Sequence, residues 1–305
     1  MMRPITLPPP LKAGDRVGLV AASSCLEGEE AIARMEAGIE ILERWGLVVT
    51  RVPLRQWGYL AGTDTERRLE LQPEAEEGAA LLACLRGGWG SARLLEQPLG
   101  LANRWLLGFS DVTSLLWAQL AQGHGGAIHG PLLTTLAGEP AWSQERLRAL
   151  LFGEPLADLE GQSWCSGQAE GPLLVANLTV ATHLLGTPHL PALEGAILVL
   201  EDVGEAPYRL ERMLTHWRLS GALQQLGGLA FGQFSACEDS SDDPQNEDQG
   251  SRRFSVEQVL LERSGDLGIP VLGGLSVGHV SGNAALPLGV LARLDGQRGR
   301  LSLLS

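Results

Sequence analysis

The first half of the chain alternates short apolar runs with segments in which apolar residues recur every three or four positions. The short runs predict strands at 17–22, 47–52, 79–85 and 105–109. Helical spacing predicts a helix that contains Ile32, Met35, Ile39 and Leu42 and stops at Gly46, and a second helix at 112–121. Strands that alternate with helices predict an α/β fold with a parallel sheet, in which functional loops follow the carboxyl ends of the strands.

The second half resumes this alternation after an interruption. Between residues 151 and 171 the periodicity fades, so we predict an N-terminal domain at 1–155, a linker at 156–170 and a C-terminal domain at 171–305. Apolar runs predict strands at 173–175, 196–200 and 229–234, and helical spacing predicts helices at 208–219 and 256–263. The final segment, 284–304, is typical of strands at an antiparallel edge.

One predicted strand ends at a serine. The run 105–109 stops at Ser110, and leucines at helical spacing follow, so Ser110 is expected at a strand-to-helix corner. A side chain at such a corner projects above the sheet edge, and the first amides of the helix point towards a bound ligand. The corner can therefore supply a nucleophile and part of an oxyanion site. Ser110 and Asp111 are also good helix caps, and this segment alone favours capping.

Two further segments carry catalytic residue types. Glu201 follows the apolar run 197–200, and His279 lies in the glycine-flanked segment 278–283. With Ser110 they stand in the order serine, acid, histidine, which is the order of the α/β-hydrolases. A serine hydroxyl needs a neutral imidazole to accept its proton, and the imidazole needs a carboxylate to fix its tautomer. The three residues together therefore suit acyl transfer.

Alternatives exist for two members of this set. Asp202 and Glu205 follow Glu201 closely, although such carboxylates are more often surface charges or helix caps. His129 is the main rival of His279 among the six histidines. The local sequence leaves both choices open.

Composition narrows the classes of function. The formal net charge of −13 argues against nucleic acid or an anionic membrane as a partner. Lys12 is the only lysine, which excludes a Walker phosphate loop, and the four cysteines form no CxxC pair that would indicate a zinc site. Without a signal core or a run of about 18 apolar residues, we expect a soluble cytoplasmic protein. The acidic segment 238–250 is predicted to be a mobile surface loop.

Six short motifs are spread along the chain. They are Arg-Gly-Gly-Trp-Gly at 86–90, Gly-Phe-Ser-Asp-Val-Thr at 108–113, His-Gly-Pro at 129–131, Asn-Leu-Thr at 177–179, Leu-Glu-Asp-Val-Gly-Glu at 200–205 and Gly-His-Val-Ser-Gly-Asn at 278–283. Taken together and in this order, they resemble the LD-carboxypeptidase family of serine peptidases. That family includes muramoyltetrapeptide carboxypeptidases and microcin C self-immunity peptidases, and the resemblance extends from about Gly14 to Leu294.

The resemblance implies a parallel, flavodoxin-like N-terminal α/β domain and a smaller C-terminal β/α domain with a mixed sheet. It implies Ser110 as the nucleophile, His279 as the base and Glu201 as the carboxylate that orients the base. The backbone amides of Asp111 and Gly88 would form the oxyanion site, in a cleft between the domains. No metal or other cofactor is implied, and members of the family are commonly homodimers.

The implied reaction is hydrolysis of a small peptide, the cytoplasmic murein tetrapeptide. The bond cleaved would join an L-centre diamino acid, meso-diaminopimelate or lysine, to the terminal D-alanine. Two departures from the family pattern leave the substrate preference open: Ala176 precedes Asn177 where glycine is usual, and Trp89 replaces a tyrosine. Trp89 and Asn177 are the residues expected to contact the substrate.

Two alternative functions remain. One is a self-immunity hydrolase of a peptidyl or aminoacyl nucleotide analogue, in which Trp57, Trp89 or Trp164 would stack on the base. The other is a non-catalytic protein that binds a small ligand on the same scaffold.

Two arginines near the glycine motif have an open role. Arg86 and Arg93 could each pair with the terminal carboxylate that an exopeptidase must recognise. A structural ion pair with Asp111 or Glu96 is an equally good interpretation.

Overall fold

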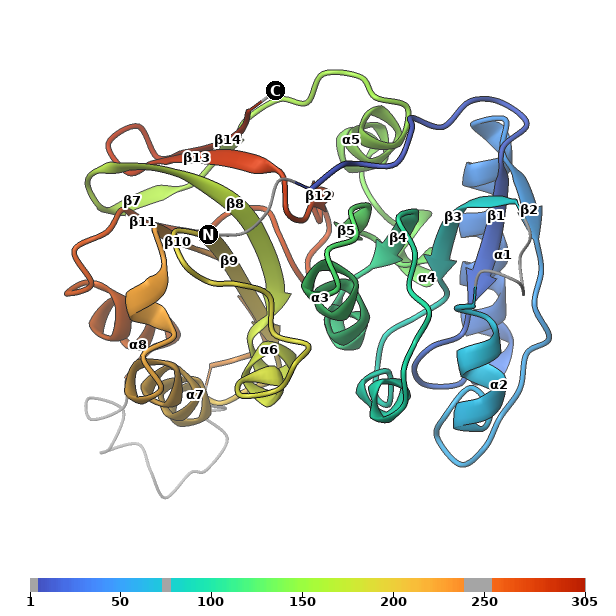
Figure 1. Ribbon diagram of the computed structural model, residues 1–305, viewed down its shortest axis with the longest axis horizontal. Helices are drawn as coiled ribbons and strands as arrows, with labels where there is room; N and C mark the ends of the chain where they lie inside the picture. Colours follow the sequence, from blue (N-terminus) through green and yellow to red (C-terminus); the bar gives the residue numbers. More distant parts are fainter. Residues whose placement is uncertain (1–4, 73–77, 239–253, 305) are drawn as a thin grey trace.

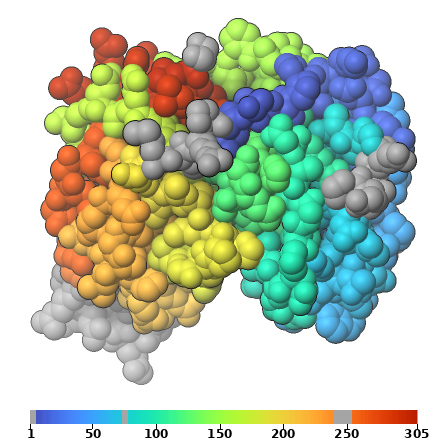
Figure 2. Space-filling model, viewed as in Figure 1, coloured from blue at the N-terminus to red at the C-terminus, as the bar shows by residue number. Residues whose placement is uncertain are grey.

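The computed structural model describes residues 5–72, 78–238 and 254–304. The chain forms two α/β units that lie side by side, the N-terminal one blue to green and the C-terminal one yellow-green to red (Figures 1 and 2). Each unit is built on one sheet. No helix in the described part of the chain is both long enough and apolar enough to cross a bilayer.

The N-terminal unit contains a six-stranded sheet with strand order β12-β5-β4-β3-β1-β2. Neighbouring strands among β1 to β5 are parallel, and their order, 2-1-3-4-5, is the flavodoxin-like order expected from the sequence. These strands are β1 (Arg16–Val20), β2 (Val48–Thr50), β3 (Ala79–Cys84), β4 (Trp105–Gly108) and β5 (Ala127–His129). Every residue of β4 is buried, because a parallel strand covered on both faces needs a continuous apolar run.

Helices connect these strands. They are α1 (Gly28–Arg44), α2 (Asp64–Leu69), α3 (Thr113–Ala121), α4 (Leu133–Leu136) and α5 (Ala141–Leu151), with the 3-10 turns η1 (Ala92–Glu96) and η2 (Ser110–Val112). The strand–helix alternation read from the apolar periodicity is therefore confirmed in this unit.

The C-terminal unit contains an eight-stranded mixed sheet with strand order β6-β14-β13-β8-β9-β10-β11-β7. Strands β8 to β11 are parallel, and antiparallel strands flank them on both sides. The strands are β6 (Leu159–Glu160), β7 (Gln162–Cys165), β8 (Gln168–Asn177), β9 (Ile197–Val203), β10 (Gly228–Ser235), β11 (Val271–Gly273), β13 (Leu291–Asp295) and β14 (Arg300–Leu303). The helices are α6 (Leu178–Leu184), α7 (Pro207–Leu219) and α8 (Val256–Ser264), with the 3-10 turn η3 (Leu223–Gln225).

Two segments differ from the sequence predictions. The predicted linker at 156–170 contains β6, β7 and the start of β8, so it belongs to the C-terminal sheet. These strands lie at or near the sheet edges, where exposed polar residues weaken the apolar signal. In addition, β12 (Leu286–Pro287) leaves the C-terminal half and pairs antiparallel with β5 of the N-terminal sheet. Of the predicted acidic loop at 238–250, only Glu238 lies within the described residues.

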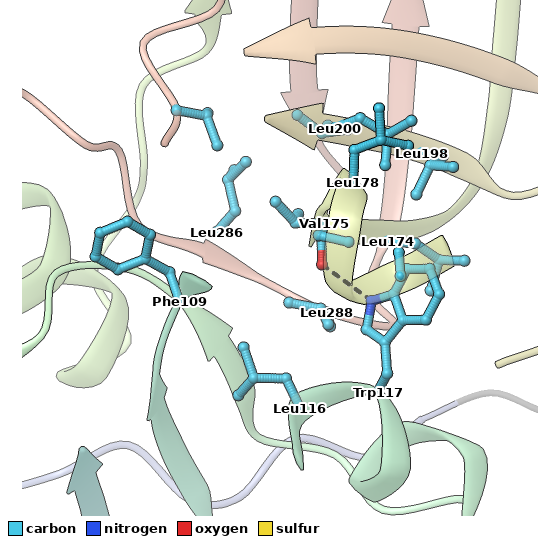
Figure 3. Close-up of a cluster of buried hydrophobic side chains, with 14 of the residues drawn as sticks. Phe109, Leu116, Trp117, Leu174, Val175, Leu178, Leu198, Leu200, Leu286 and Leu288 are labelled. Atoms are coloured by element: carbon cyan, nitrogen blue, oxygen red, sulfur yellow. Dashed lines mark hydrogen bonds between the residues drawn. The ribbon is translucent and has the colours of Figure 1, made fainter. Parts of the chain in front are cut away.

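A shared hydrophobic core joins the two units (Figure 3). Trp117 of α3 is fully buried, and its Nε1 donates a 3.0 Å hydrogen bond to the carbonyl of Val175 in β8. Phe109 and Leu116 of the N-terminal unit belong to the same cluster of buried side chains as Leu198 of β9. The carboxyl end of β4 is therefore held in a defined position relative to the carboxyl end of β9.

Candidate active site

Ser110 lies at the corner between β4 and α3, as the sequence predicted. Its φ of 62° is in the left-handed region, which a residue with a side chain rarely adopts. Gly108 allows the tight corner, because a Cβ at this position would lie 2.7 Å from Cγ1 of Val112. The corner brings Ser110 into the lining of a cavity of about 440 Å³. Backbone strain of this kind is concentrated at functional sites.

His279 lines the same cavity and is paired with a buried glutamate. Nδ1 of His279 lies 2.7 Å from Oε2 of Glu201, which is fully buried near the end of β9. Burial raises the pKa of the Glu201 carboxyl, and the hydrogen bond with His279 opposes this rise. Gly278, with φ at 115°, permits the close approach, because a Cβ there would lie 2.6 Å from the same Oε2. Since Nδ1 is held by the carboxylate, Nε2 is left for proton transfer.

The two neighbouring carboxylates have other partners. Asp202 accepts hydrogen bonds from Nδ2 of Asn177 and from the backbone amide and hydroxyl of Thr179, so it stabilises the start of α6. Glu205 forms an ion pair with Arg209 of α7 at 3.4 Å. The structure therefore brings Glu201, rather than Asp202 or Glu205, to His279.

His129, the rival base, is completely buried and is absent from the cavity lining. The ring of Phe109 packs against both histidines, with centroid distances of 5.6 Å to His129 and 4.7 Å to His279. Burial lowers the pKa of His129 to about 3, so its imidazole is neutral at pH 7. Of the two candidate bases, only His279 reaches the cavity that Ser110 lines.

The glycine loop at 86–90 packs against Ser110. A Cβ at Gly87 would lie 3.1 Å from Oγ of Ser110, and a Cβ at Gly88 would overlap the side chain of Ser24. Gly88 has φ at 111°, a conformation that favours glycine, and it also lines the cavity. The backbone of the loop therefore approaches the hydroxyl closely, which is what a backbone oxyanion site requires.

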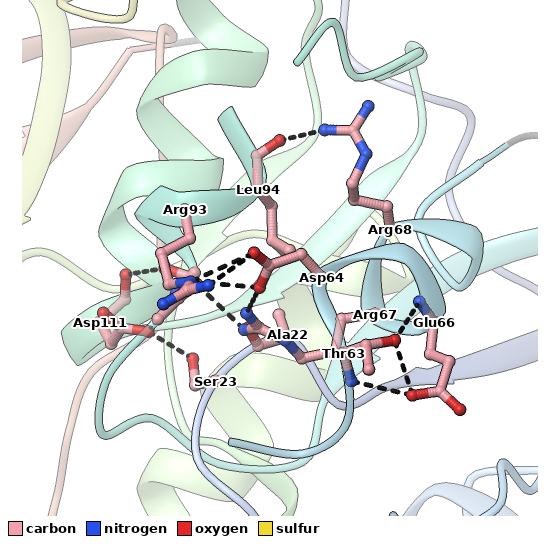
Figure 4. A network of polar contacts seen from close by, with 12 residues as sticks. Ala22, Ser23, Thr63, Asp64, Glu66, Arg67, Arg68, Arg93, Leu94 and Asp111 are labelled. Atoms are coloured by element: carbon pink, nitrogen blue, oxygen red, sulfur yellow. Dashed lines mark hydrogen bonds and ion pairs between the residues drawn. The ribbon is translucent and has the colours of Figure 1, made fainter. Parts of the chain in front are cut away.

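The side chain of Asp111 anchors the corner to its surroundings. Its carboxylate accepts hydrogen bonds from Oγ of Ser23 at 2.6 Å and from the backbone amide of Ser91 at 2.9 Å (Figure 4). Burial raises the pKa of Asp111, and these two donors oppose the rise. Because the first helical turn is fixed in this way, the backbone amide of Asp111 is held beside Ser110.

A buried arginine supports the glycine loop from behind (Figure 4). The fully buried Arg67 donates hydrogen bonds to the carbonyls of Ala22 and Gly90 and to the carboxylate of Asp64. Arg93 also binds Asp64, with Nη2 at 2.8 Å from Oδ2. Arg93 thus has a structural ion pair, although its partner is neither of the carboxylates named from the sequence.

The tryptophans that the sequence analysis offered as stacking partners for a nucleobase lie in two parts of the molecule. Trp89 is 67% exposed and lies edge-on to Tyr59, and the guanidinium of Arg93 covers the exposed ring of Trp57. Trp89 belongs to the glycine loop and Tyr59 packs against it, but none of these three rings is part of the cavity lining. Trp164 packs against Phe231 in the C-terminal sheet and is likewise absent from the cavity lining.

Asn177, expected to contact the substrate, is placed differently by the structure. It is only 4% exposed, and its Oδ1 accepts a hydrogen bond from the amide of Val180, so it caps α6. Its Nδ2 donates to Asp202. The polar groups of Asn177 are thus occupied within the fold, because an N-terminal cap and a cavity ligand require the same side chain to point in different directions.

Sequence reasoning missed Glu139. Its Oε2 accepts hydrogen bonds from the backbone amides of Gly282 at 2.7 Å and Asn283 at 3.0 Å, so the N-terminal unit holds the loop that carries His279. Oδ1 of Asn283 in turn accepts from the amide of Gly278 at 2.9 Å. Glu139 stands in a Gly-Glu-Pro turn, which resembles any solvated turn and gives no local sign of this contact.

A strained serine, a histidine–carboxylate pair and a glycine loop around one cavity define a serine hydrolase type of site. Comparison with known proteins agrees with this class. A family model described as the LD-carboxypeptidase N-terminal domain matches residues 17–130, and one described as the LD-carboxypeptidase C-terminal domain matches residues 170–294.

Full-length relatives carry related names. The chain is 46% identical to a putative carboxypeptidase of Synechocystis, with 97% of both chains covered. It is 36% identical to the murein tetrapeptide carboxypeptidase of Pseudomonas aeruginosa, with 93% and 94% covered. It is also 25% identical to the microcin C7 self-immunity protein of Escherichia coli, with 96% and 94% covered.

Solved structures show the same architecture. The muramoyltetrapeptide carboxypeptidase of Oxalobacter formigenes superimposes with a TM-score of 0.79 at 27% identity, covering 94% of this chain and 97% of that one. The microcin C7 self-immunity protein gives a TM-score of 0.83 at 23% identity, with 98% of both chains covered, which shows the fold alone. This chain belongs to the LD-carboxypeptidase family and is an enzyme of the serine-type carboxypeptidase class.

Proposed function

We propose that this enzyme removes the terminal D-alanine from a murein tetrapeptide by acyl transfer through Ser110, His279 and Glu201. The observation that carries the proposal is the cavity that Ser110 and His279 share, with His279 hydrogen-bonded to a buried Glu201 at 2.7 Å. A base oriented by a carboxylate beside a strained serine is the arrangement that activates a hydroxyl nucleophile. The relatives named murein and muramoyltetrapeptide carboxypeptidases support the substrate class.

The proposed reaction has two halves. In the first, Oγ of Ser110 attacks the carbonyl carbon of the L-centre diamino acid while Nε2 of His279 accepts the hydroxyl proton. The backbone amides of Asp111 and Gly88 stabilise the oxyanion, and His279 then protonates the departing amine of D-alanine. In the second half, water attacks the acyl-enzyme with His279 as the base, and Ser110 is released. Glu201 keeps the imidazole oriented and stabilises its charged form throughout.

Release of D-alanine tests this proposal directly. The parent and the Ser110→Ala variant are incubated with L-Ala-γ-D-Glu-meso-diaminopimelyl-D-Ala, and D-alanine is followed by mass spectrometry. We expect release by the parent and a loss of kcat of at least about 10⁴-fold in the variant, because no other group can form the acyl-enzyme. Ser302→Ala, on strand β14 of the C-terminal sheet and outside the cavity lining, is the matched control and should retain activity. Equal release by the parent and Ser110→Ala would contradict a serine mechanism.

A second function in the same family has one observation in its favour. Two exposed aromatic rings, Trp89 of the glycine loop and Tyr59 edge-on to it, offer a surface on which a nucleobase can stack. The alternative is hydrolysis of an aminoacyl nucleotide analogue, as the name of the self-immunity relative suggests. A parent enzyme that leaves the tetrapeptide intact but cleaves an aspartyl nucleotide analogue would support this alternative over the first proposal.

We further propose that the enzyme acts in the cytoplasm as a homodimer, with Trp89 at the rim of the site in contact with the substrate. Light scattering on the purified protein measures the molar mass, and a value near 32.5 kDa would contradict the dimer.

A further inference from the structure

The cavity beside Ser110 is cationic in a strongly acidic protein. Its lining contains Arg34 and Arg86 and, among the residues that the structure describes, no carboxylate, whereas the adjoining cavity, which shares Arg34 and His279 with it, also contains Glu30 and Glu139. The formal net charge of the whole chain is −13, so the positive charge of the cavity lining is opposite in sign to the net charge of the protein. A concave surface lined by one sign of charge concentrates groups of the opposite sign. The cavity is therefore suited to an anionic part of the substrate.

Of the two arginines, Arg86 has the guanidinium without a counter-ion. Arg34 is paired with Glu30 one turn earlier on α1, and 55% of its side chain is exposed. Nη1 of Arg86 donates a 2.9 Å hydrogen bond to the carbonyl of Cys25, which is a neutral acceptor. Within the described ranges Arg86 makes no ion pair. This single bond holds the side chain in place and leaves other N–H donors for a ligand.

Arg86 lies on the glycine loop that packs against Ser110, and both residues line the same cavity. A Cβ at Gly88 would lie 3.7 Å from Nη2 of Arg86, and a Cβ at Gly87 would lie 3.1 Å from Oγ of Ser110. The guanidinium and the hydroxyl thus flank the same two glycines. In a carboxypeptidase substrate the terminal carboxylate lies a single residue past the bond that is cleaved, so a cation that recognises it has to lie in the cavity of the nucleophile, as Arg86 does.

We propose that Arg86 binds the terminal carboxylate of the substrate and thereby restricts cleavage to the last bond. The inference rests on the proposed function and adds to it the residue that distinguishes an exopeptidase from an endopeptidase. A guanidinium matches a carboxylate with two parallel, charge-assisted hydrogen bonds. An internal peptide bond or a terminal amide has no charge at this position, so it cannot form this pair.

Binding to an inactive enzyme tests the assignment without turnover. In the Ser110→Ala background, calorimetry compares the tetrapeptide L-Ala-γ-D-Glu-meso-diaminopimelyl-D-Ala with its terminal carboxamide. We expect the acid to bind about 10- to 100-fold more tightly than the amide, the range for a hydrogen-bonded charged group. Adding Arg86→Gln should weaken binding of the acid alone until the two affinities are equal. Arg86→Lys should retain part of the preference, because it keeps the charge but loses the fork.

Controls separate this site from other effects. Arg51→Gln removes a surface arginine that pairs with Glu36 and should leave both affinities unchanged. An Arg86→Gln protein that still binds the amide as well as its parent has an intact cavity, so misfolding cannot explain the loss of acid binding.

The other results of these binding measurements either overturn the role of Arg86 or separate it from the proposed reaction. Three results would overturn the assignment. The first is equal binding of the acid and the amide to the protein in which Arg86 is unchanged. The others are a preference for the acid that survives Arg86→Gln and a preference that is lost only in Arg34→Gln. If instead the acid is preferred through Arg86 while the active parent releases no D-alanine, the proposed reaction fails and the carboxylate site stands. The two failures are therefore distinguishable.

Discussion

At the scale of single residues, the site depends on backbone conformations that side chains disfavour. Ser110 has φ at 62°, while Gly88 and Gly278 adopt positive φ values where a Cβ would overlap Ser24 and Glu201 respectively. The two glycines avoid the steric cost by lacking a Cβ, but Ser110 cannot, because its hydroxyl is the proposed nucleophile. Strain at this position is thus tied to the chemistry rather than to folding.

The strained backbone at Ser110 predicts that a substitution which relieves the strain raises the stability of the protein while it abolishes activity. Ser110→Gly should be inactive and about 1 kcal/mol more stable than Ser110→Ala, because glycine adopts the left-handed conformation without a steric penalty. Denaturant unfolding measures the difference. Ala236, with φ at 53°, offers a matched control, since Ala236→Gly should gain stability without losing activity. A Ser110→Gly protein less stable than Ser110→Ala would show that the corner is not strained.

At the scale of elements, a short helix beside the glycine loop is fixed by ion pairs, one of them with a buried arginine, rather than by its own propensity. Helix α2 has only six residues, yet it supplies Asp64, which binds Arg67 and Arg93. Arg67 in turn donates to the carbonyl of Gly90 in the glycine loop. A helix this short is marginal alone, so tertiary contacts must hold it.

Removal of the Asp64 charge should therefore destabilise the protein in a pH-dependent way. The ion pairs with Arg93 and Arg67 hold the pKa of Asp64 below its ordinary value of 3.8. A lowered carboxyl pKa contributes stability that is present above 3.8 and is lost as the pH falls through the folded value. Asp64→Asn should cost about 2 kcal/mol at pH 7, because it removes the carboxylate that is hydrogen-bonded to the buried Arg67.

Urea unfolding at a series of pH values measures this effect. The stability gap between the parent and Asp64→Asn should narrow as the pH falls below 3.8. Glu36→Gln, which removes an exposed partner of Arg51, is the control and should change stability by less than about 1 kcal/mol. A gap that stays constant from pH 7 to pH 3 would mean that the Asp64 charge is not responsible.

At the scale of the whole molecule, the proposed catalytic set is assembled from both units. Ser110 follows β4 of the N-terminal sheet, whereas Glu201 and His279 come from the C-terminal half. Their relative position depends on the shared core around Trp117 and on Glu139, which crosses to the loop of His279. The two units should therefore unfold together, since the core between them is continuous.

A matched pair of core variants tests this dependence. Trp117→Leu lies at the contact between the units, and Trp105→Leu lies within the N-terminal core. Each substitution removes a buried indole that donates a hydrogen bond to a backbone carbonyl. Both should lose about 3–4 kcal/mol of stability. Only Trp117→Leu should also lower kcat clearly, because it loosens α3 against β8. Two separate unfolding transitions in the parent, or equal kcat values in the two variants, would contradict a shared core that sets the site.

Much of this arrangement is readable from the sequence. Apolar runs that end at a polar residue indicate strand ends, and this local rule found the Ser110 corner. At Glu201 the rule ended the strand too early, because β9 continues to Val203 and includes Glu201. The same rule failed at 156–170, where edge strands with alternating exposure carry a weak apolar signal. It also gave no sign of Glu139 or of the β12–β5 pairing, because neither contact is local in the chain.

The sequence by itself determined the strand–helix alternation of the N-terminal unit, the residue types of the proposed catalytic set and the corner at Ser110, because each depends on neighbouring residues. The strand order and the choice of Glu201 and His279 came only from the family resemblance, and the tertiary structure adds the contact between these two residues, because partners are brought together in space. It also separated Arg86, which faces the cavity, from Arg93, which is bound to Asp64. A charge has the same sequence signal whether it is paired or free, and packing alone distinguishes the two.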